Sequence, residues 1–292
     1  MSELLDELLD LLDLEEIELN IFRGQNESTR QGRLFGGQVA AQALVAAGRT
    51  TAGLPAHSLH GYFLRPGDPS VPVLYSVDRI RDGRSFTTRR VVALQRGKAI
   101  FNTSISFHEP ELSYEHQIAM PKAPDPETVP TWAERVQEMI DRIPEEARNW
   151  APRPRPVDLR HVELPTYLGG EPSHGTSLVW IRVPRELADD ALLHQALLTY
   201  ASDYSLLDNV VRPHGRKGEL GPLMMASLDH AVWFHRPLRV DEWLLYVQDS
   251  PVASGARGFA RGTIFTRAGE LVASVAQEGL MRPARKPEDR SQ

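Results

Sequence analysis

A carboxylate lies where the sequence otherwise predicts a buried helix face. Residues 192–207 are predicted to form a helix, and an apolar stripe follows it through Ala196, Tyr200, Tyr204 and Leu207. Asp203 falls within that stripe. Removing a carboxylate from water is costly unless hydrogen bonds or a counter-charge compensate it. We therefore interpret Asp203 as a candidate general base in a dry pocket; the alternative is that it only accepts a hydrogen bond from a nearby backbone amide.

Two further polar side chains lie on strands that are expected to border this helix. Gln277 follows Leu271, Ala273 and Val275 at a spacing of two, so we expect it to point the same way as those side chains. Ser227 is expected to share a strand face with Met225, Ala231 and Trp233. Each residue alone is a weak signal. Together a carboxylate, a hydroxyl and an amide could hold one water molecule in line with a carbonyl group.

The second half of the chain repeats the first. Arg65 and Arg236 occur in similar motifs 171 positions apart, and Gly97 and Gly269 begin similar strands 172 positions apart. This spacing predicts two copies of one small domain in tandem. At the offset of 171, Ser227 corresponds to Ala56 and Gln277 to Ser106, and the first predicted helix (39–48) carries no carboxylate. We therefore expect the first copy to lack the catalytic groups and to act as scaffold and binding wall.

Each copy reads as one central helix followed by several long strands, an α+β arrangement. A helix wrapped by an antiparallel sheet is a hot dog, and two copies would form a double hot dog with a continuous sheet. The strands are predicted at residues 71–79, 85–95 and 99–108 in the first copy, and at 178–183, 226–235, 242–250, 256–266 and 271–281 in the second. The second copy has an insertion around residues 210–222, which is either part of a substrate channel or an ordinary surface loop.

A proline-rich connection separates the copies. Residues 110–172 contain 11 of the 22 prolines and one predicted helix, Trp132–Ile143. The rest should run extended over the surface and cross to the far side of the second copy. An acidic amphipathic helix is predicted within residues 1–20 and should pack on its own protein. The predicted divisions are a first copy at 1–112, a linker at 113–172, a second copy at 173–284 and a polar tail at 285–292.

Composition narrows the function further. The net charge of −6 argues against a nucleic-acid surface, which needs clustered Lys and Arg. With no cysteine, disulfides and thiolate nucleophiles are excluded, which fits a cytoplasmic protein. The ten histidines show no metal-binding spacing, there is no Gly-x-Ser-x-Gly motif, and no segment is apolar enough for a membrane span. His60, His230 and His235 are interpreted as structural, and Gly36-Gly37 as either an oxyanion-binding helix start or a tight turn.

Seven short segments, in this order and spacing, resemble the type II acyl-CoA thioesterase family. They are Phe22-Arg23-Gly24-Gln25, Phe35-Gly36-Gly37-Gln38-Val39, His60-Gly61-Tyr62-Phe63, Tyr200-Ala201-Ser202-Asp203, Ser227-Leu228-Asp229-His230, Trp233-Phe234-His235-Arg236-Pro237 and Gln277-Glu278-Gly279 with Met281-Arg282. The resemblance spans nearly the whole chain. It implies the double hot-dog fold, association of subunits into a homo-oligomer, and water activation by Asp203, Ser227 and Gln277. Bacterial members often have threonine at the position of Ser227, and peroxisomal members have serine there.

The sequence therefore predicts hydrolysis of fatty acyl-CoA to free acid and coenzyme A by an activated water, without a metal or redox cofactor. A helix-terminal amide is expected to stabilise the oxyanion. The alternatives are a hot-dog hydratase or dehydratase acting on acyl thioesters, and a non-catalytic module that binds acyl-CoA.

Overall fold

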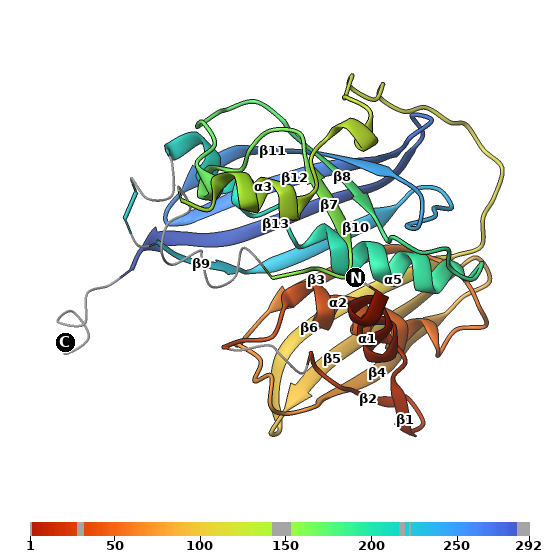
Figure 1. The fold of residues 1–292 in the computed structure, drawn as a ribbon. Coiled ribbons are helices and arrows are strands. Elements are labelled where there is room, and N and C mark those ends of the chain that lie inside the picture. Colours follow the sequence, from red (N-terminus) through yellow and green to blue (C-terminus); the bar gives the residue numbers. More distant parts are fainter. Residues whose placement is uncertain (1, 28–31, 142–152, 216–219, 222, 285–292) are drawn as a thin grey trace, which may run out of the picture.

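The computed structural model describes residues 2–27, 32–141, 153–215, 220–221 and 223–284. Within these residues a single antiparallel sheet contains thirteen strands, in the order β1-β2-β4-β5-β6-β3-β10-β13-β12-β11-β8-β7, with β9 paired to β13 (Figure 1). The first-half strands are β1 (Glu15–Glu18), β2 (Ile21–Gly24), β3 (Ala56–Phe63), β4 (Val73–Asp82), β5 (Phe86–Gln95) and β6 (Lys98–His108). The second-half strands are β7 (Asp158–His161), β8 (Ser177–Arg182), β9 (Leu223–Ser227), β10 (Asp229–Phe234), β11 (Leu244–Ser254), β12 (Arg257–Thr266) and β13 (Leu271–Pro283). The helices are α1 (Ser2–Leu12), α2 (Gly36–Gly48), α3 (Trp132–Met139), α5 (Ala191–Ser202) and α6 (Asp208–Val211).

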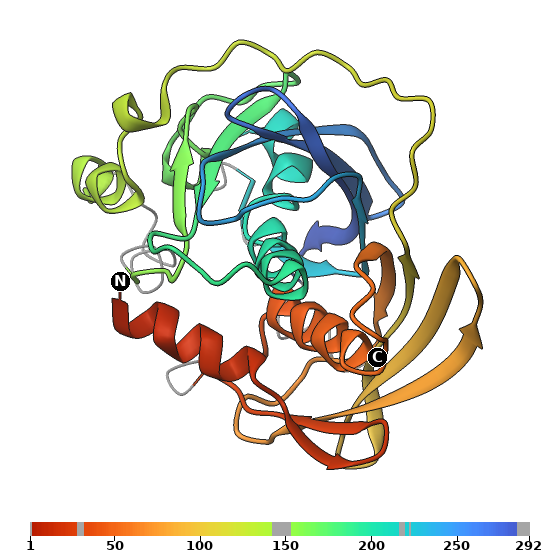
Figure 2. The ribbon, with the colours of Figure 1, turned by 90° about the vertical axis from the view of Figure 1, so that its right-hand side faces the viewer.

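The strand order is nearly the same when it is read outward from the centre in either direction. On one side β3, β6, β5, β4 and β2 follow one another, and on the other β10, β13, β12, β11 and β8 do so in the corresponding order. The two halves join where β3 pairs with β10, with Gly61 opposite His230. Each half-sheet has one long helix against its inner face (Figure 2). The predicted double hot dog with a continuous sheet is therefore confirmed.

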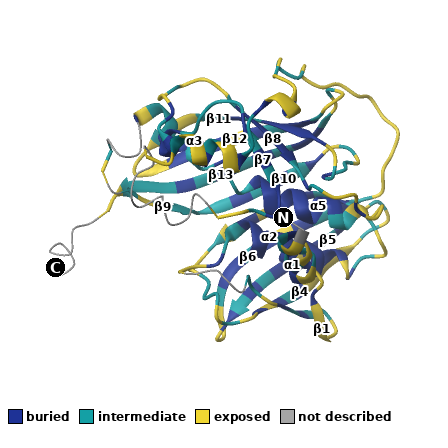
Figure 3. Ribbon diagram, in the orientation of Figure 1, coloured by how far each residue is buried: buried dark blue, intermediate teal, exposed yellow. Residues whose placement is uncertain are grey.

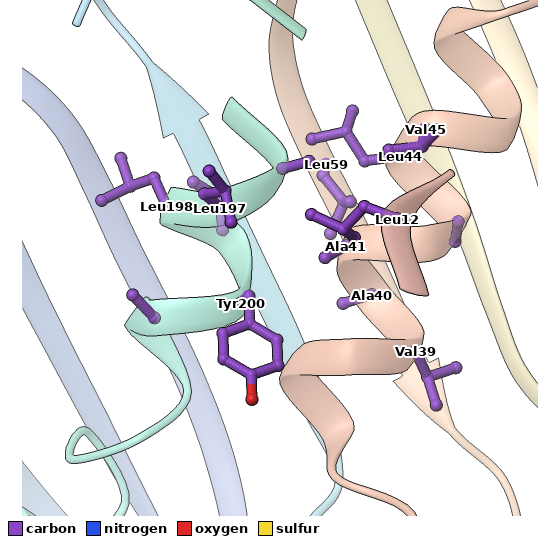
Figure 4. Close-up of a cluster of buried hydrophobic side chains, with 14 of the residues drawn as sticks. Leu12, Val39, Ala40, Ala41, Leu44, Val45, Leu59, Leu197, Leu198 and Tyr200 are labelled. Carbon is purple, nitrogen blue, oxygen red and sulfur yellow. The ribbon is translucent and has the colours of Figure 1, made fainter. Parts of the chain in front are cut away.

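Helices α2 and α5 lie side by side between the two half-sheets (Figure 2). They run in opposite directions, because Gly37 at the start of α2 lies against Tyr200 near the end of α5, and Gly48 lies against Leu192. Small side chains permit this approach: Ala40 and Ala41 are fully buried beside Leu197 and Tyr200 (Figure 4). Both helices are buried, whereas one side of α1 and much of the outer face of the first half-sheet are exposed to solvent (Figure 3).

Each half-sheet has a β-bulge at the same place in the repeat. In β3 the register with β6 shifts between Ala56 and Ser58. In the second half Ser227 lies opposite Gly279, and Ala231 lies opposite Ala276. The chain thus advances four residues from Ser227 to Ala231 while β13 advances three, so one residue is extra. The extra residue is therefore close to Leu228. A bulge reverses which side chains point inward, and bulges are common beside active sites.

The linker covers the outer face of the second half-sheet. Val129 packs there with Trp180, Trp243 and Phe265, and the indole of Trp180 donates a hydrogen bond to the carbonyl of Pro124 at 3.0 Å. The crossing to the second copy that was predicted is present (Figure 1). The segment also supplies β7, which pairs with β8 and forms an edge of the sheet.

Several predicted boundaries need correction. The helix predicted at 192–207 ends at Ser202, and the helix predicted at Trp132–Ile143 ends at Met139, with residues 142–152 outside the described part. Within residues 1–20, α1 ends at Leu12 and β1 follows. As expected, α1 packs on its own protein: Leu5, Leu8, Leu11 and Leu12 are buried, and Leu4 and Leu9 are partly buried. The predicted tail at 285–292 and part of the insertion (216–219 and 222) also lie outside the described residues. No helix among the described residues is long and apolar enough to cross a membrane.

Separating the copies should abolish activity, because it removes the β3–β10 pairing and exposes a sheet edge. We expect residues 173–292 to be insoluble or inactive alone and to regain activity when coexpressed with residues 1–172. A second pair, 1–112 and 113–292, keeps the linker with the second copy, and 113–292 alone should still be inactive. Assays of acyl-CoA hydrolysis, the activity that the resemblance implies, on the purified fragments test this. A soluble fragment of the second copy with a kcat/KM near that of the full chain would contradict it.

Candidate active site

Asp203 lies at the end of α5 and not within it. The helix begins at Ala191 and ends at Ser202, with Asp203 as the C-cap residue. Its N-cap residue is Asp190, whose side chain accepts hydrogen bonds from the amides of Leu192 and Leu193. The Asp203 Oδ2 accepts a hydrogen bond from the Gly37 amide at 2.8 Å. That amide belongs to the first turn of α2, where backbone N–H groups are free and the helix dipole favours an anion. A carboxylate is thus stabilised here although its surroundings are largely apolar.

Gln277 connects Asp203 with Ser227. Its Nε2 donates to Asp203 Oδ1 at 2.6 Å and to Ser227 Oγ at 2.9 Å, so both amide hydrogens are used. The side chain is fully buried, and its Oε1 has no hydrogen-bond partner among the described residues. The structure therefore brings together the three side chains that the sequence singled out. Their catalytic role stays a prediction.

The bulge near Leu228 gives Ser227 its direction. Ser227 lies opposite Gly279, two residues from Gln277, and side chains two apart on a strand share a face. Beyond the bulge it is His230 and Val232 that are buried, while Ala231 and Trp233 face outward. The expectation that Ser227 shares its face with Ala231 and Trp233 is therefore wrong.

A similar shift separates Leu271 from Gln277. The register between β12 and β13 changes between Ile264 and Phe265, so that Leu271 packs into the outer cluster with Phe265. Ala273 and Val275 are buried in the main core, on the face of Gln277. Ala273 and Val275 therefore point to the same face as Gln277, as predicted, whereas Leu271 points to the opposite face of the sheet.

Gly36 and Gly37 are required by close packing. A Cβ on Gly36 would lie 2.9 Å from Asp203 Oδ2 and 2.8 Å from Phe63 Cζ, and one on Gly37 would lie 2.6 Å from the Tyr200 carbonyl oxygen. The Gly37 amide binds the Asp203 carboxylate, so it is not the oxyanion donor that the sequence allowed for. Gly36 lines the cavity in front of the carboxylate.

A cavity of about 460 Å³ opens in front of Asp203 and Ser227. Most of its wall is apolar and comes from both copies: Leu34, Phe35, Val39, Phe63, Leu64, Ile100 and Phe101 from the first, and Leu207, Met224, Ala226 and Leu228 from the second. The first copy was expected to supply a binding wall, but its particular residues were not identified from the sequence. The only feature of the sequence that pointed to these residues was the repeat, which predicts that a site lies where the two copies meet.

The corresponding place in the first copy has different chemistry. Across the strands Ala260 lies opposite Gln277, and Arg89 lies opposite Ile105. The counterpart of Gln277 is thus Ile105, one residue from the Ser106 that was predicted from the offset of 171. The Arg89 side chain fills this region: it is 1% exposed and donates to Thr50 Oγ1 at 2.8 Å, beside the C-terminus of α2.

A buried histidine, His230, lies close to the site, and its sequence context favours a structural role. His230 is fully buried, and its Nε2 lies 2.8 Å from Ser202 Oγ. Burial lowers the pKa of His230, and the negative charges of Asp203 and Asp229 oppose this only in part, so the ring is neutral near pH 7. Among the described residues no three His, Asp or Glu side chains are grouped as metal ligands.

Fold and site together define a double hot-dog protein with a carboxylate, an amide and a hydroxyl at the end of an apolar cavity. The family model for the acyl-CoA thioesterase N-terminal domain matches residues 25–108, and the model for acyl-CoA thioesterase matches residues 148–280. Acyl-coenzyme A thioesterase 8 of Mus musculus is 38% identical over 93% of this chain and 88% of its own length. Acyl-CoA thioesterase 2 of Haemophilus influenzae is 36% identical over 97% of this chain and 99% of its own.

A solved structure agrees with these relatives. The acyl-CoA thioesterase II TesB2 of Mycobacterium marinum is 43% identical, covers 95% of this chain and 98% of its own, and superimposes with a TM-score of 0.78. The chain therefore belongs to the acyl-CoA thioesterase family, and it is a thioester hydrolase.

Replacing Gly36 by alanine should damage the site while the fold persists. The added methyl group would press on Asp203 Oδ2 and Phe63, and overpacking of this kind typically costs about 1–3 kcal/mol. We expect kcat/KM to fall at least about tenfold and Tm to drop by a few degrees. Gly175→Ala is the control, because its Cβ would meet only Ser173 Oγ, at 3.4 Å. If Gly36→Ala retained full activity, the close packing around the carboxylate would not matter.

Proposed function

We propose that this chain hydrolyses acyl-CoA thioesters to a free fatty acid and coenzyme A, with water as the nucleophile and Asp203 as the general base. The observation that carries the proposal is that the Gln277 amide donates to both Asp203 and Ser227 at the end of a mostly apolar cavity. The cavity suits an acyl chain, and the polar groups at its end suit a thioester carbonyl and one water molecule.

The hydrogen bonds assign a direction to each group. An ionised Asp203 only accepts, so the Gln277 NH₂ must face it, and Ser227 Oγ then accepts the second N–H of Gln277. The Ser227 hydrogen is left to donate toward water or the thioester oxygen. Asp203 takes a proton from water as the water oxygen bonds to the thioester carbon. When the C–S bond breaks, that proton passes to the sulfur of coenzyme A, and the acid and the thiol leave.

The oxyanion needs a donor of its own. A helix-terminal amide was expected in this role, and the Gly37 N–H is occupied by Asp203. Gly36, at the first position of α2 and in the cavity wall, is the residue of that helix that we propose for this contact.

Two alternatives make different products. A hydratase or dehydratase would leave the thioester intact, whereas only a thioesterase releases free thiol. A module that merely binds acyl-CoA would show stoichiometric binding without turnover. A half-buried carboxylate held by two donors favours catalysis over binding alone.

Two further expectations extend the proposal. Association into a homo-oligomer is supported by large exposed side chains on the outer face of the first half-sheet, such as Tyr62 (62% exposed) and Leu74 (41%). A cytoplasmic location is supported by the absence of cysteine. The net charge of −6 remains an argument against nucleic acid as a partner.

Asp203→Asn should keep the fold and lose most turnover, because asparagine is nearly isosteric but cannot take a proton. Loss of a general base typically lowers the rate by about 10²–10⁴. We would measure kcat with octanoyl-CoA by thiol release, and Tm by calorimetry. The matched control is Asp190→Asn at the other end of α5, where asparagine also caps a helix, and its kcat should be unchanged. A loss below about fivefold for Asp203→Asn would exclude the general-base role.

Ser227→Thr should be tolerated, whereas Ser227→Ala should lower kcat by about tenfold or more, because the hydroxyl hydrogen is the functional group. Steady-state kinetics of both variants test this. Mass spectrometry of the wild-type enzyme, quenched during turnover, should show no added acyl mass. An acyl adduct on Ser227 would replace the direct-water mechanism with a covalent one.

A further inference from the structure

Two arginines occupy the same place in the repeat but have different partners. Arg65 Nη1 donates to the carbonyl of Ala99 at 2.7 Å, and Arg236 Nη1 donates to the carbonyl of Leu271 at 2.9 Å. Each guanidinium thus fastens a central strand to the beginning of its neighbour. Arg236 is also neutralised by Glu115 of the linker, whose carboxylate lies 3.2 Å from Nη2. Arg65 is exposed and has no carboxylate partner among the described residues.

Arg65 lies in the wall of the cavity that contains Asp203 and Ser227. A second cation, Arg33, also lines this cavity, and its Nη2 donates to the carbonyl of Met225 at 3.0 Å. Both arginines are exposed, whereas Asp203 and Ser227 are half-buried. The other acidic residue of the wall, Asp208, interacts with the hydroxyl of Tyr167. The cationic groups therefore occupy the exposed part of the cavity, apart from the reacting groups.

The repeat itself points to a ligand for Arg65. In the second copy the guanidinium of Arg236 binds the Glu115 carboxylate. In the first copy the guanidinium of Arg65 binds none of the described carboxylates and lies in the wall of the cavity. The whole chain carries a charge of −6, so an approaching polyanion is repelled unless local cations compensate. A guanidinium held by one nitrogen still offers its other N–H groups to phosphate oxygens in a planar, bidentate arrangement.

We propose that Arg65 binds a phosphate group of the coenzyme A part of the substrate, with Arg33 adding a second positive charge. The assignment rests on the proposed function, because it requires an acyl-CoA with its acyl carbon at Asp203. Arg65 is then a specificity residue that recognises the carrier and takes no part in the chemical step. The first copy thus supplies the carrier site and the second copy the catalytic groups.

The test compares octanoyl-CoA with octanoyl-pantetheine, which has the same thioester and no phosphate. For Arg65→Gln we expect kcat/KM for octanoyl-CoA to fall about five- to twentyfold, mainly because KM rises. This range lies between the loss typical of an exposed ion pair and the loss typical of a charge-assisted hydrogen bond. With octanoyl-pantetheine the value should change less than about twofold. Arg65→Lys keeps the charge and should restore part of the loss. A third substrate, octanoyl-3′-dephospho-CoA, distinguishes the 3′-phosphate from the pyrophosphate. If Arg65→Gln causes no loss with this substrate, Arg65 binds the 3′-phosphate; if the loss persists, Arg65 binds the pyrophosphate.

Arg236→Gln is the matched control, since it removes the same strand-fastening bond in the other copy. It should affect both substrates equally, if at all, and Tm of both variants reports any structural damage. Equal losses on both substrates for Arg65→Gln, or no loss on either, would overturn the proposal. Wild-type enzyme that releases thiol from neither substrate would instead overturn the proposed function.

Discussion

The hydrogen bond from the Gly37 amide to the Asp203 carboxylate is the contact on which the rest of the site depends. It joins residues 166 positions apart and from different copies, so it exists only when α2 and α5 lie antiparallel and in close contact. That contact in turn needs glycine at the start of α2, since any Cβ there would meet Tyr200 or Asp203 itself. The free N–H groups of the first turn of α2 provide a hydrogen-bond donor for the carboxylate at the end of an apolar helix. The close packing of α2 against α5 and the stabilisation of the Asp203 carboxylate therefore depend on the same glycines.

The tandem arrangement lets a symmetric backbone carry an asymmetric site. Strand order and the position of the first bulge are repeated, but the paired positions Ala260 and Gln277 of one copy are Arg89 and Ile105 in the other. Ala260 leaves room for polar groups beneath the helix end, whereas the Arg89 side chain occupies the equivalent space and binds Thr50. Two identical chains could not differ in this way. Covalent fusion therefore permits the division of roles that we propose, with stability and binding in one copy and chemistry in the other.

The repeat and the period-two patterns predicted two tandem copies of a unit with one helix and several long strands, because both are properties of the sequence itself, and the resemblance to the thioesterase family implied the double hot dog. Asp203 could be found because a carboxylate within an apolar stripe conflicts with burial. The end of α5 could not be predicted, since tertiary contacts at Gly37 decide it. The bulges near Leu228 and Val272 were also missed: one inserted residue reverses the facing of a strand, and no residue type marks it here. The structure therefore places Ser227 beside Gln277, as expected, but with different neighbours on its strand face from those predicted.

The charge of Asp203 fixes the direction of every hydrogen bond in the set. A carboxylate accepts from the Gln277 NH₂, so Gln277 must also donate to Ser227, and the Ser227 hydrogen is left for the cavity. If Asp203 were protonated, it could donate to a reversed Gln277 amide, whose oxygen would then accept the Ser227 hydrogen and withdraw it from the substrate. In the proposed mechanism, the general base and the hydroxyl donor are thus coupled through one buried amide. In the proposed mechanism this coupling requires only a hydroxyl at residue 227, which either serine or threonine would supply. At residue 277 it requires an amide, because only an amide can donate to a carboxylate and a hydroxyl at once without a charge of its own.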